Sequence, residues 1–523
     1  MHISTMSGNF IVYVNKLASS ERDPKLARLE TKMAIGQIRR WADCKPDALA
    51  VTQGSFRLSY REFLSTIASV QPLLGAIRGR RGNTVVVATS RLLEAWITSL
   101  AARSLGLNAI AIQTPSAIPD LNLSDIHCVL ADGSSGFSSS SLGDKIPEQC
   151  PVIVLPKLAE LRSDRNLTPE VSDAVGSQIL YTTGTTGSSK KVVMDGQLEE
   201  RRNQYRAECF NIKPSTVVYT DLPPSCGAGF KTPSAVWHTG GAVVFDRTLD
   251  LPSHLRRDGV NSVLAGPNQI RNLLNRGSLP DELKHSFEIV YTSGPFPAEL
   301  AEATADGLTR NINIYFGATE IIGRPLRSEF RGRDDLIWLK PEPGRKIRIV
   351  KDTGEDCDIN EEGKLAIELA DVDARDYLDD PQTSKQVFRN DFFVPGDLAV
   401  KREDGRVRLL GRVADVIVIR GSKKPVGPIE FAIQSYLGAE EVCVFAELHE
   451  TGQEEAIVAV RTERQITQPE MDYIARNLLP IELVRFARLN QFPRSEGAFG
   501  KTLRAELRKL LHATRPRPDE RPQ

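Results

Sequence analysis

Short β-branched segments alternate with longer stretches of helical apolar spacing through the first four-fifths of this 523-residue sequence. The run 84–90 (TVVVATS) is followed by 92–106, where apolar residues recur at helical intervals, and then by 108–113 (NAIAIQ). Strands covered on both faces read as continuous apolar runs, and a strand followed by a helix is the unit of a parallel sheet. The sequence therefore predicts an α/β fold with mostly parallel sheets, whose ligands sit at the carboxyl ends of the strands.

The same alternation continues along the chain until the texture changes near residue 411. Further strands of the large region are predicted at 127–132, 152–155, 177–182, 217–220, 241–246, 262–265 and 288–292. A smaller module follows, with strands predicted at 416–419, 442–446 and 456–460 between helices. We expect an N-terminal domain over 1–410, a small α+β domain over 411–512, and a disordered Pro-rich tail over 513–523.

Composition excludes several classes of protein. The 67 Lys and Arg residues balance 67 Asp and Glu residues, which disfavours a nonspecific nucleic-acid binder. No uncharged run reaches the roughly 18 residues of a membrane-spanning helix, and the N-terminus lacks the pattern of a secretory signal. The seven Cys are scattered without a CxxC pair, which favours reduced thiols over a disulfide or zinc framework. We therefore expect a cytoplasmic protein without a membrane span.

The strongest local motif spans 177–193, SQILYTTGTTGSSKKVV. A strand-like run enters a stretch in which hydroxyl residues surround Gly184 and Gly187, and Lys190 and Lys191 close it. Small residues let the backbone approach a ligand, hydroxyl and N–H groups can donate to phosphate oxygens, and a lysine adds positive charge. The Walker pattern GxxxxGK[ST] fails at its final positions. A phosphate-binding loop is favoured, with a mobile polar linker as the alternative.

Seven blocks of the sequence resemble those of the adenylate-forming superfamily, which contains acyl- and aryl-CoA synthetases, peptide-synthetase adenylation domains and luciferases. The first is YTTGTTGSSK at 181–190, and the others follow in the family's order: YTSGPFP at 291–297, YFGATE at 315–320, YLDDPQTSK at 377–385, VPGDL at 394–398, GRVADVIVIRG at 411–421 and FPRSEGAFGKTLR at 492–504. The resemblance covers residues 35–512. It implies a large N-terminal domain of α/β layers and a small, mobile C-terminal domain.

The resemblance also implies a reaction in two steps that needs ATP and Mg²⁺. A small carboxylic acid attacks the α-phosphate of ATP and releases pyrophosphate, and the acyl-adenylate then passes to the thiol of CoA or of a phosphopantetheine on a separate acyl or peptidyl carrier protein. Two alternatives stay open. One is a stand-alone adenylation protein that loads a carrier. The other is a catalytically impaired homologue that binds a ligand, suggested by Ala414 in the hinge block and by two extra residues between Ser495 and Gly500.

Four residues take catalytic roles by this resemblance. Lys501 would stabilise charge between the carboxylate and the α-phosphate, and Lys190 would hold the β- and γ-phosphates. Glu320 would ligate Mg²⁺, and Thr319 would hydrogen-bond the α-phosphate. The residues by themselves leave plainer interpretations open: Lys190 as a solvated cation at a helix start, and Glu320 as a helix-capping acid.

The implied nucleotide site is larger. Asp397 would accept hydrogen bonds from the ribose hydroxyls, with a turn-forming acid as the alternative, and Arg412 would contact ribose or phosphate, with a surface salt bridge as the alternative. The full ATP- and AMP-binding set comprises Thr182, Thr183, Gly184, Thr185, Thr186, Gly187, Lys190, Ser293, Gly294, Pro295, Tyr315, Phe316, Gly317, Ala318, Thr319, Asp397, Arg412 and Lys501.

The acyl pocket is expected along 221–244, where Cys226, Gly227 and Phe230 would line it. Peptide-synthetase domains place an Asp where Gly227 or Ala228 stands, so an α-amino acid would leave its ammonium unpaired and is disfavoured. A neutral-bodied acyl or aryl acid is expected instead. We interpret Cys226 as a packing residue rather than a reactive thiol, and we expect Arg504 to pack on a helix.

Overall fold

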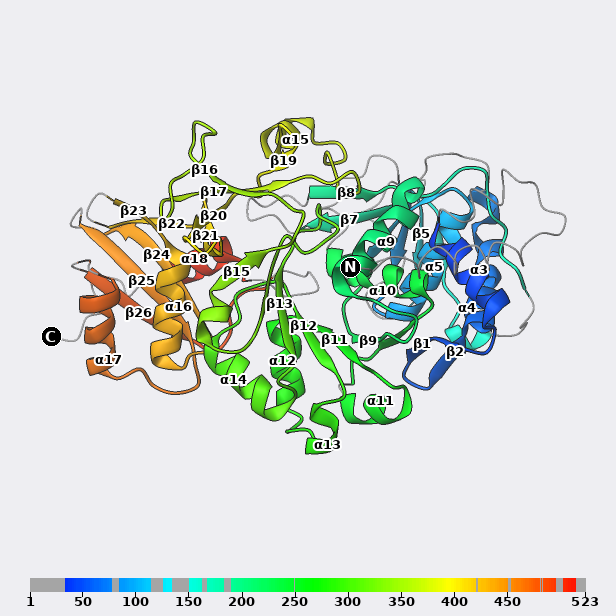
Figure 1. Ribbon diagram of the computed structural model, residues 1–523, viewed down its shortest axis with the longest axis horizontal. Helices are drawn as coiled ribbons and strands as arrows, with labels where there is room; N and C mark the ends of the chain where they lie inside the picture. The colour runs from blue at the N-terminus through cyan, green and yellow to red at the C-terminus, as the bar shows by residue number, and fades with distance from the viewer. Residues whose placement is uncertain are drawn as a thin grey trace, which may run out of the picture.

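The computed structural model describes residues 33–77, 84–113, 126–133, 150–161, 167–182, 190–248, 250–419, 422–449, 453–479, 481, 483–494 and 502–513 (Figure 1). Two parts of the predicted site, Thr183–Gly187 and Lys501, lie outside these residues.

A six-stranded sheet occupies the N-terminal part of the described chain. Its order is β6-β5-β3-β4-β7-β8, and neighbours run parallel except for the antiparallel pair of β7 and β8. The strands are β3 (Thr84–Ala88), β4 (Asn108–Ile112), β5 (Ile126–Ala131), β6 (Val152–Val154), β7 (Gln178–Thr182) and β8 (Lys190–Met194). Each strand predicted in this region is present.

A second, mixed sheet contains 15 strands among the described residues. Its central part, β13-β12-β11-β9-β10-β1, is parallel, as the βα alternation predicts, and the rest is antiparallel. The strands are β1 (Leu49–Gln53), β2 (Phe56–Ser59), β9 (Val217–Thr220), β10 (Ala242–Phe245), β11 (Ser262–Ala265), β12 (Glu288–Tyr291), β13 (Ile312–Phe316), β14 (Leu326–Glu329), β15 (Trp338–Pro341), β16 (Ile347–Val350), β17 (Glu362–Glu368), β18 (Phe388–Arg389), β19 (Phe392–Phe393), β20 (Asp397–Lys401) and β21 (Val407–Arg412). β21 is the last strand of this sheet along the chain, and it ends at Arg412. The domain boundary predicted at residue 410 therefore falls inside β21.

Helices fill the space between the two sheets and cover the other face of the parallel part of the large sheet (Figure 1). The helices of this region are α3 (Ala34–Cys44), α4 (Tyr60–Val70), α5 (Leu92–Ser104), α8 (Leu158–Leu161), α9 (Glu199–Phe210), α10 (Gly227–Thr239), α11 (Leu251–Arg257), α12 (Pro267–Leu274), α13 (Asp281–Lys284), α14 (Ala298–Gly307) and α15 (Pro381–Val387). α5 packs on β3 and β4, whereas α10 packs on β9 and β10. Every residue of α5 is buried, as expected of a helix enclosed on all sides.

Aromatic side chains of α5 and α10 pack against each other in the core between the two sheets. Trp96 of α5 meets Trp237 of α10 edge-on, with ring centroids 4.8 Å apart, and stacks on Phe230 at 5.3 Å. Trp237 donates its indole N–H to the carbonyl of Ala50 at 2.9 Å. One continuous apolar cluster therefore links the six-stranded sheet to the parallel part of the large sheet.

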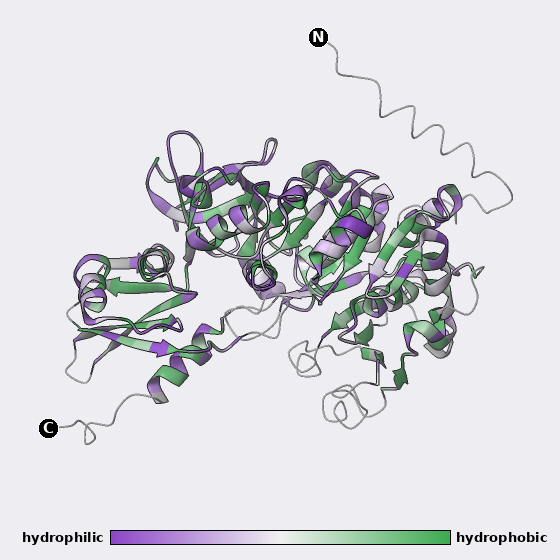
Figure 2. Cartoon of the chain, turned by 90° about the horizontal axis from the view of Figure 1, so that it is seen from below, coloured by the Kyte–Doolittle hydropathy of each residue, from purple (hydrophilic) through white to green (hydrophobic). Residues whose placement is uncertain are grey.

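The C-terminal module contains a three-stranded sheet with helices on both faces and a separate two-stranded sheet, and it lies at one end of the molecule (Figure 2). Its elements are β22 (Val416–Ile419), β23 (Ser422–Pro425), α16 (Val426–Leu437), β24 (Glu441–Leu448), β25 (Glu454–Arg461), α17 (Gln468–Tyr473), a π-helical turn (Ile474–Leu478), β26 (Leu483–Leu489) and α18 (Arg504–Ala513). Apolar residues of α16 pack on one face of the sheet and those of α18 on the other. The predicted α/β fold with a small α+β C-terminal domain is confirmed.

Arg504, which was expected to pack on a helix, begins α18 and contacts α16. Its guanidinium donates to Glu430 Oε1 of α16 and to the Val444 carbonyl, both at 2.7 Å. It also lies 3.3 Å from an oxygen of Asp415. Glu430 is half-buried against the sheet, where a carboxylate is stabilised by a cationic partner. None of the described helices is both long and apolar enough to cross a membrane.

Candidate functional site

Two of the predicted nucleotide-binding segments leave the large sheet side by side. β12 and β13 are parallel neighbours, with Tyr291 opposite Ile314, so the residues that follow them meet at one edge of the sheet. After β12, Ser293 has a φ of +87°, a left-handed backbone that a serine rarely adopts and that costs roughly 1–3 kcal/mol. The Tyr291 hydroxyl donates to the Pro295 carbonyl at 2.9 Å and holds this turn.

The turn after β13 carries Thr319 and Glu320. Each backbone carbonyl of residues 318–322 accepts a hydrogen bond from a residue outside the turn. The ammonium of Lys231 donates to the carbonyls of Ala318 at 2.8 Å, Thr319 at 3.3 Å and Ile321 at 2.6 Å. The remaining two carbonyls, of Glu320 and Ile322, accept from the Ala374 N–H at 2.9 Å and from the Arg206 guanidinium at 2.8 Å. We call residues 318–322 the acidic turn.

A carboxylate on the far side completes the support of the acidic turn. Asp373 accepts the N–H of Ile322 at 2.8 Å and forms an ion pair with Arg345. Both side chains of that pair are almost completely buried. The guanidinium of Arg345 also donates to the Tyr205 hydroxyl of α9 at 2.9 Å. The acidic turn is thus fixed between α9, α10 and the segment around residue 373.

Glu320 points from this turn toward Tyr377 and Lys190. The Tyr377 hydroxyl donates to Glu320 Oε1 at 2.6 Å, and the Lys190 ammonium lies 5.2 Å from the centre of the Tyr377 ring. Glu320 and Tyr377 are only 6% and 5% exposed. Burial raises the pKa of Tyr377, and the neighbouring Glu320 raises it further, so this hydroxyl stays a proton donor. The sequence also allowed Lys190 to be a solvated cation at a helix start and Glu320 to be a helix-capping acid. The structure matches neither, because Lys190 begins β8 and Glu320 caps no described helix.

The chain segment that supplies Tyr377 is attached directly to β8. The Leu378 N–H donates to the carbonyl of Lys191 at 2.9 Å, and the Lys191 ammonium pairs with Asp379 at 2.9 Å. Asp380 then caps α15 by accepting the N–H of Thr383 at 3.0 Å. Pairing between β7 and β8 places Thr182 opposite Lys190. These local contacts explain why the end of the phosphate motif and the Tyr377 ring lie together.

Asp397 and Arg412 are brought together by the pairing of β20 and β21, which sets them opposite each other. The Arg412 Nε lies 3.1 Å from Asp397 Oδ1, and its guanidinium also donates to the Pro395 carbonyl at 2.7 Å. The positive charge of Arg412 opposes the rise in the pKa of Tyr377. The structure thus brings Lys190 and Glu320 together at Tyr377, with Thr319 beside Glu320 in the acidic turn, and it pairs Asp397 with Arg412 across β20 and β21.

The remaining predicted nucleotide residues differ in exposure. Gly294, Pro295 and Gly317 are exposed, and Ser293, Phe316 and Ala318 are half-buried. Tyr315 is 7% exposed and meets Phe210 of α9 edge-on at 5.0 Å. Its side chain therefore faces the core between the helices and not the edge of the sheet.

The three predicted acyl-pocket residues lie at the N-terminal end of α10. Cys226 is the N-cap: its Sγ accepts the Gly229 N–H at 3.3 Å and donates to the Pro223 carbonyl at 3.4 Å. Burial raises the pKa of this thiol to about 11, which agrees with a packing role. Phe230 lies in the aromatic core, and Gly227 touches the acidic turn so closely that an added Cβ would come within 3.0 Å of Thr319 Oγ1.

A small enclosed cavity lies beside these residues, between α9 and α10. Its lining includes Asn203, Arg206, Phe230, Lys231 and Ile322. The space open to the centre of a water molecule is about 10 Å³, enough for about one water. The Nδ2 of Asn203 and the Nε of Arg206 have no hydrogen-bond partner among the residues that the structure describes, and a single buried water there would supply one.

Lys231 is the residue that the motifs missed. It is 6% exposed, and burial together with the charge of Arg206 lowers the pKa of its ammonium to about 7, although Glu320 and Asp373 act in the opposite direction. The sequence contains one usable signal, because the lysine interrupts a run of small and apolar residues, GAGFKTPSAVW, over 227–237. Tyr377 was also given no role, although it opens the block at 377–385.

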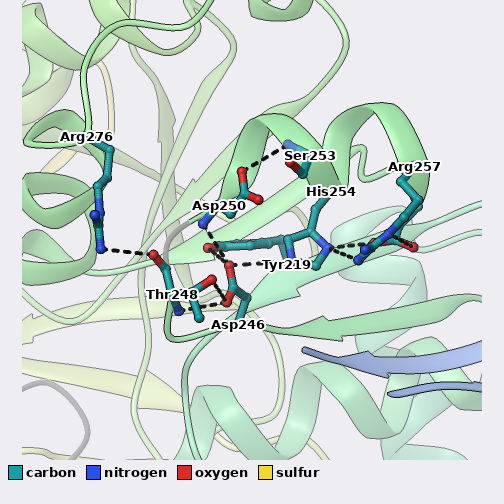
Figure 3. A network of polar contacts seen from close by, with 9 residues as sticks. Tyr219, Asp246, Thr248, Asp250, Ser253, His254, Arg257 and Arg276 are labelled. Carbon is teal, nitrogen blue, oxygen red and sulfur yellow. Dashed lines mark hydrogen bonds and ion pairs between the residues drawn. The ribbon is translucent and has the colours of Figure 1, made fainter. Parts of the chain in front are cut away.

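A second buried polar network lies at the carboxyl ends of β9 and β10 and had no sequence signature (Figure 3). His254 of α11 lies 2.6 Å from Asp258 Oδ2 and 3.5 Å from Asp246 Oδ2. Asp246 also accepts from the Tyr219 hydroxyl at 3.1 Å and from the Thr248 N–H at 2.7 Å. We call this group the His254 network.

The donor set around Glu320 fits Mg²⁺. The Tyr377 hydroxyl takes Oε1, and Oε2 has no hydrogen-bond partner among the described residues. Mg²⁺ is commonly held by one or two carboxylates together with substrate phosphates and water. One open carboxylate oxygen is therefore sufficient from the protein. Within the described ranges, no group of three or more His, Cys, Asp or Glu side chains could hold a metal by itself.

Comparison with known proteins agrees with this arrangement. The family model described as AMP-binding enzyme matches residues 38–372. An uncharacterized acyl–CoA ligase, YtcI, of Bacillus subtilis is 24% identical over 409 residues, which are 71% of this chain and 74% of that protein. Propionate–CoA ligase of Escherichia coli is 23% identical, covering 79% of this chain and 76% of its own length.

The fold recurs in solved structures. O-succinylbenzoate coenzyme A synthetase from Bacillus subtilis, in complex with ATP and magnesium ion, superposes with a TM-score of 0.76 at 19% identity and covers 90% of this chain and 99% of its own. The family model spans more than half of the 523 residues. The chain is an AMP-forming, acyl-CoA ligase-like enzyme and belongs to the AMP-binding enzyme family.

Proposed function

We propose that this protein activates a small carboxylic acid with ATP and Mg²⁺, releases pyrophosphate, and transfers the acyl group from the adenylate to the thiol of CoA. The observation that carries the proposal is the meeting of Lys190 and Glu320 at Tyr377, on the turn that follows β13 at the edge where β12 and β13 end. Cationic and carboxylate groups there have the chemistry that a triphosphate, a divalent cation and a ribose require.

The chemical problem is to bring two anions together, a carboxylate and the α-phosphate. Lys190 would bind the β- and γ-phosphates, and the Thr319 hydroxyl would orient the α-phosphate for attack. Glu320 would hold Mg²⁺, which supplies charge neutralisation at the phosphates when it is bound. Asp397, oriented by Arg412, would accept from the ribose hydroxyls. Lys501 would stabilise the charge that develops between carboxylate and phosphate.

The acid is expected to have a neutral acyl or aryl body. Gly227 and Ala228 offer no carboxylate to an α-ammonium group, and the nearby ammonium of Lys231 would repel one. The close contact between Gly227 at the start of α10 and Thr319 favours an acid with a compact body. The E. coli relative, a propionate–CoA ligase, supports both a short acid and CoA as the acceptor.

The test is ATP–pyrophosphate exchange across a panel of carboxylic acids, from acetate and propionate to benzoate, with two α-amino acids as a contrast. We expect exchange with one neutral acid class and a loss of roughly 10²–10³-fold in Lys501→Ala. ATP binding without exchange for any acid would refute the activity and support the impaired homologue. Thioester formation on CoA and on a separate phosphopantetheinyl carrier, compared directly, decides the acceptor.

A further inference from the structure

We propose that Lys231 is a positioning residue for adenylation: its ammonium fixes the acidic turn so that Thr319 and Glu320 meet ATP and Mg²⁺ in a single geometry. The role of the acidic turn in catalysis rests on the proposed function. The contact itself does not, because the order of the turn can be measured on the protein without any substrate.

The geometry of the ammonium leaves little room for another role. An ammonium has three N–H donors, and Lys231 directs them at three carbonyls within four residues, those of Ala318, Thr319 and Ile321. With its donors used in this way, Lys231 has none left for a substrate group. It also forms no ion pair with a carboxylate in the described part of the chain. Its contacts are therefore with the backbone that carries the predicted site, and not with the reacting molecules.

The burial of two cations beside each other costs free energy, so we expect a function for the charge of Lys231. Lys231 of α10 and Arg206 of α9 are buried side by side, and like charges in a poorly solvated space repel. A methionine or leucine at residue 231 would fill a similar volume without the desolvation penalty of a buried ion. Both cations donate to carbonyls of the same turn, and the carboxylates of Glu320 and Asp373 offset part of their positive charge.

The same helix also sets the distance to the turn. Gly227 lies one helical turn before Lys231, and a Cβ there would approach Thr319 Oγ1 to 3.0 Å and Thr319 Cα to 3.1 Å. The absent side chain allows α10 to touch the acidic turn, and the lysine then ties the turn to the helix. The Glu320 side chain remains directed to Tyr377 on the other side.

The experiment compares Lys231→Met, Lys231→Arg and the matched control Lys213→Met, which replaces an exposed lysine. Hydrogen–deuterium exchange of the full-length protein without ligand reports on the amides of Ile321 and Ile322, and calorimetry reports on ATP binding with and without Mg²⁺. We expect Lys231→Met to exchange these amides about tenfold or more faster, and to lose the enhancement of ATP binding by Mg²⁺. Lys231→Arg should retain part of both, and Lys213→Met should match the wild type.

Kinetics separate positioning from substrate recognition. With the preferred acid, Lys231→Met should lower kcat for exchange about 10- to 100-fold, the equivalent of one charge-assisted hydrogen bond, with the KM for the acid little changed. A raised KM for the acid at unchanged kcat would overturn the proposal, because it would make Lys231 a substrate ligand. Equal protection of Ile321 and Ile322 in Lys231→Met and wild type would also overturn it.

Two further outcomes are distinguishable. If wild type shows no exchange with any acid, the proposed function fails, whereas amide protection and Mg²⁺-dependent ATP binding still decide the role of Lys231. If Lys231→Met loosens the entire N-terminal domain and loses activity only in proportion to its unfolded fraction, the residue is a general stabiliser and the proposal is wrong. Should Lys231→Met fail to fold, Lys231→Gln replaces it in the same measurements.

Discussion

Two buried polar groups lie on the large sheet, the acidic turn and the His254 network, and they use charge in opposite ways. In the His254 network each carboxylate faces several donors: Asp246 accepts from Tyr219 and Thr248, and Asp258 pairs with His254, Arg257 and Arg57. At the acidic turn the cations face backbone carbonyls, and Glu320 keeps Oε2 without a partner among the described residues.

The difference separates a stabilising network from a candidate binding site. A polar group that is already satisfied inside the protein gains nothing from a ligand, whereas an open carboxylate oxygen on a rigid backbone can accept one. Burial and shifted pKa values occur in both places and therefore do not distinguish them. The two groups differ instead in how completely their polar atoms are hydrogen-bonded. Substitutions in them should accordingly have different effects on activity and on stability.

The largest effect on activity is expected for Glu320→Gln. The amide keeps the size of the side chain but removes the negative charge that would bind Mg²⁺, so ATP–pyrophosphate exchange should fall roughly 10²–10³-fold. The thermal midpoint should change little, because one carboxylate oxygen has no described partner to lose. Exchange measured against Mg²⁺ concentration checks this, with the exposed Glu282→Gln as control. Exchange at the wild-type level would remove Glu320 from the site.

Tyr377→Phe should have the next largest effect. It removes the donor to Glu320 Oε1 while keeping the ring beneath Lys190. A hydrogen bond to a charged group contributes about 1.5–3 kcal/mol, so exchange should fall roughly 10- to 100-fold. Steady-state exchange rates provide the measurement, and Tyr473→Phe, whose tyrosine is 43% exposed, is the control. An unchanged rate would show that the contact does not orient Glu320 during the reaction.

Gly227→Ala should have a smaller effect and acts from the opposite side. The new methyl group would press on Thr319 at 3.0–3.1 Å, so the acidic turn has to shift by a few tenths of an ångström. We expect exchange to fall up to about tenfold, with a loss of stability of about 1–3 kcal/mol from overpacking. Gly75→Ala, where the methyl group meets no atom within 4 Å, is the matched control. A more active variant would contradict the idea that α10 sets the position of Thr319.

Asp246→Asn should leave the kinetics of exchange unchanged and lower stability. The amide leaves at least one of the donors that face Asp246 without an acceptor, which typically costs about 1–3 kcal/mol. Denaturant unfolding at pH 7 measures the loss, and KM for ATP should match the wild type. The exposed Asp371→Asn, with 83% of the aspartate side chain accessible, serves as control. A selective rise in KM for ATP would show that the His254 network belongs to the site after all.

The same variant tests a pH dependence. Burial raises the pKa of Asp246, but hydrogen bonds from His254 and Thr248 lower it more, so that it lies below the ordinary 3.8. A carboxyl whose pKa is depressed by folding stabilises the protein above its unfolded pKa, and that stability is lost as pH falls through the folded pKa. Wild-type unfolding free energy should therefore fall as pH drops below about 4, and Asp246→Asn should show a flatter curve.

The strands around the site were predictable because they are local features. The runs at 84–90, 217–220, 262–265 and 288–292 are apolar and β-branched, and each forms a strand of the structure within a residue or two. Parallel pairing of β12 with β13 then follows the βα alternation and brings the blocks at 291–297 and 315–320 to one edge. The placement of Glu320 near Lys190 was predicted from the resemblance alone.

Tyr377 and Lys231 could not be assigned in the same way. Tyr377 reaches Glu320 across 57 residues of sequence, and Lys231 reaches Ala318 across 87. A lysine on a helix is most often solvated, and nothing in its neighbours shows which carbonyls it will meet. The His254 network is of the same kind, because its members are common polar residues at the ends of different strands and one helix.

By itself, the sequence determined the α/β alternation, the division into a large and a small domain, the order of the motif blocks and the family to which they belong. These depend on local periodicity and on residue types at fixed spacing. Only the tertiary structure decided that Lys231 fixes the acidic turn, that Tyr377 orients Glu320 and that His254 is enclosed between two carboxylates. Burial and the direction of backbone carbonyls arise only when distant segments pack together, and they determine what a charged side chain can do.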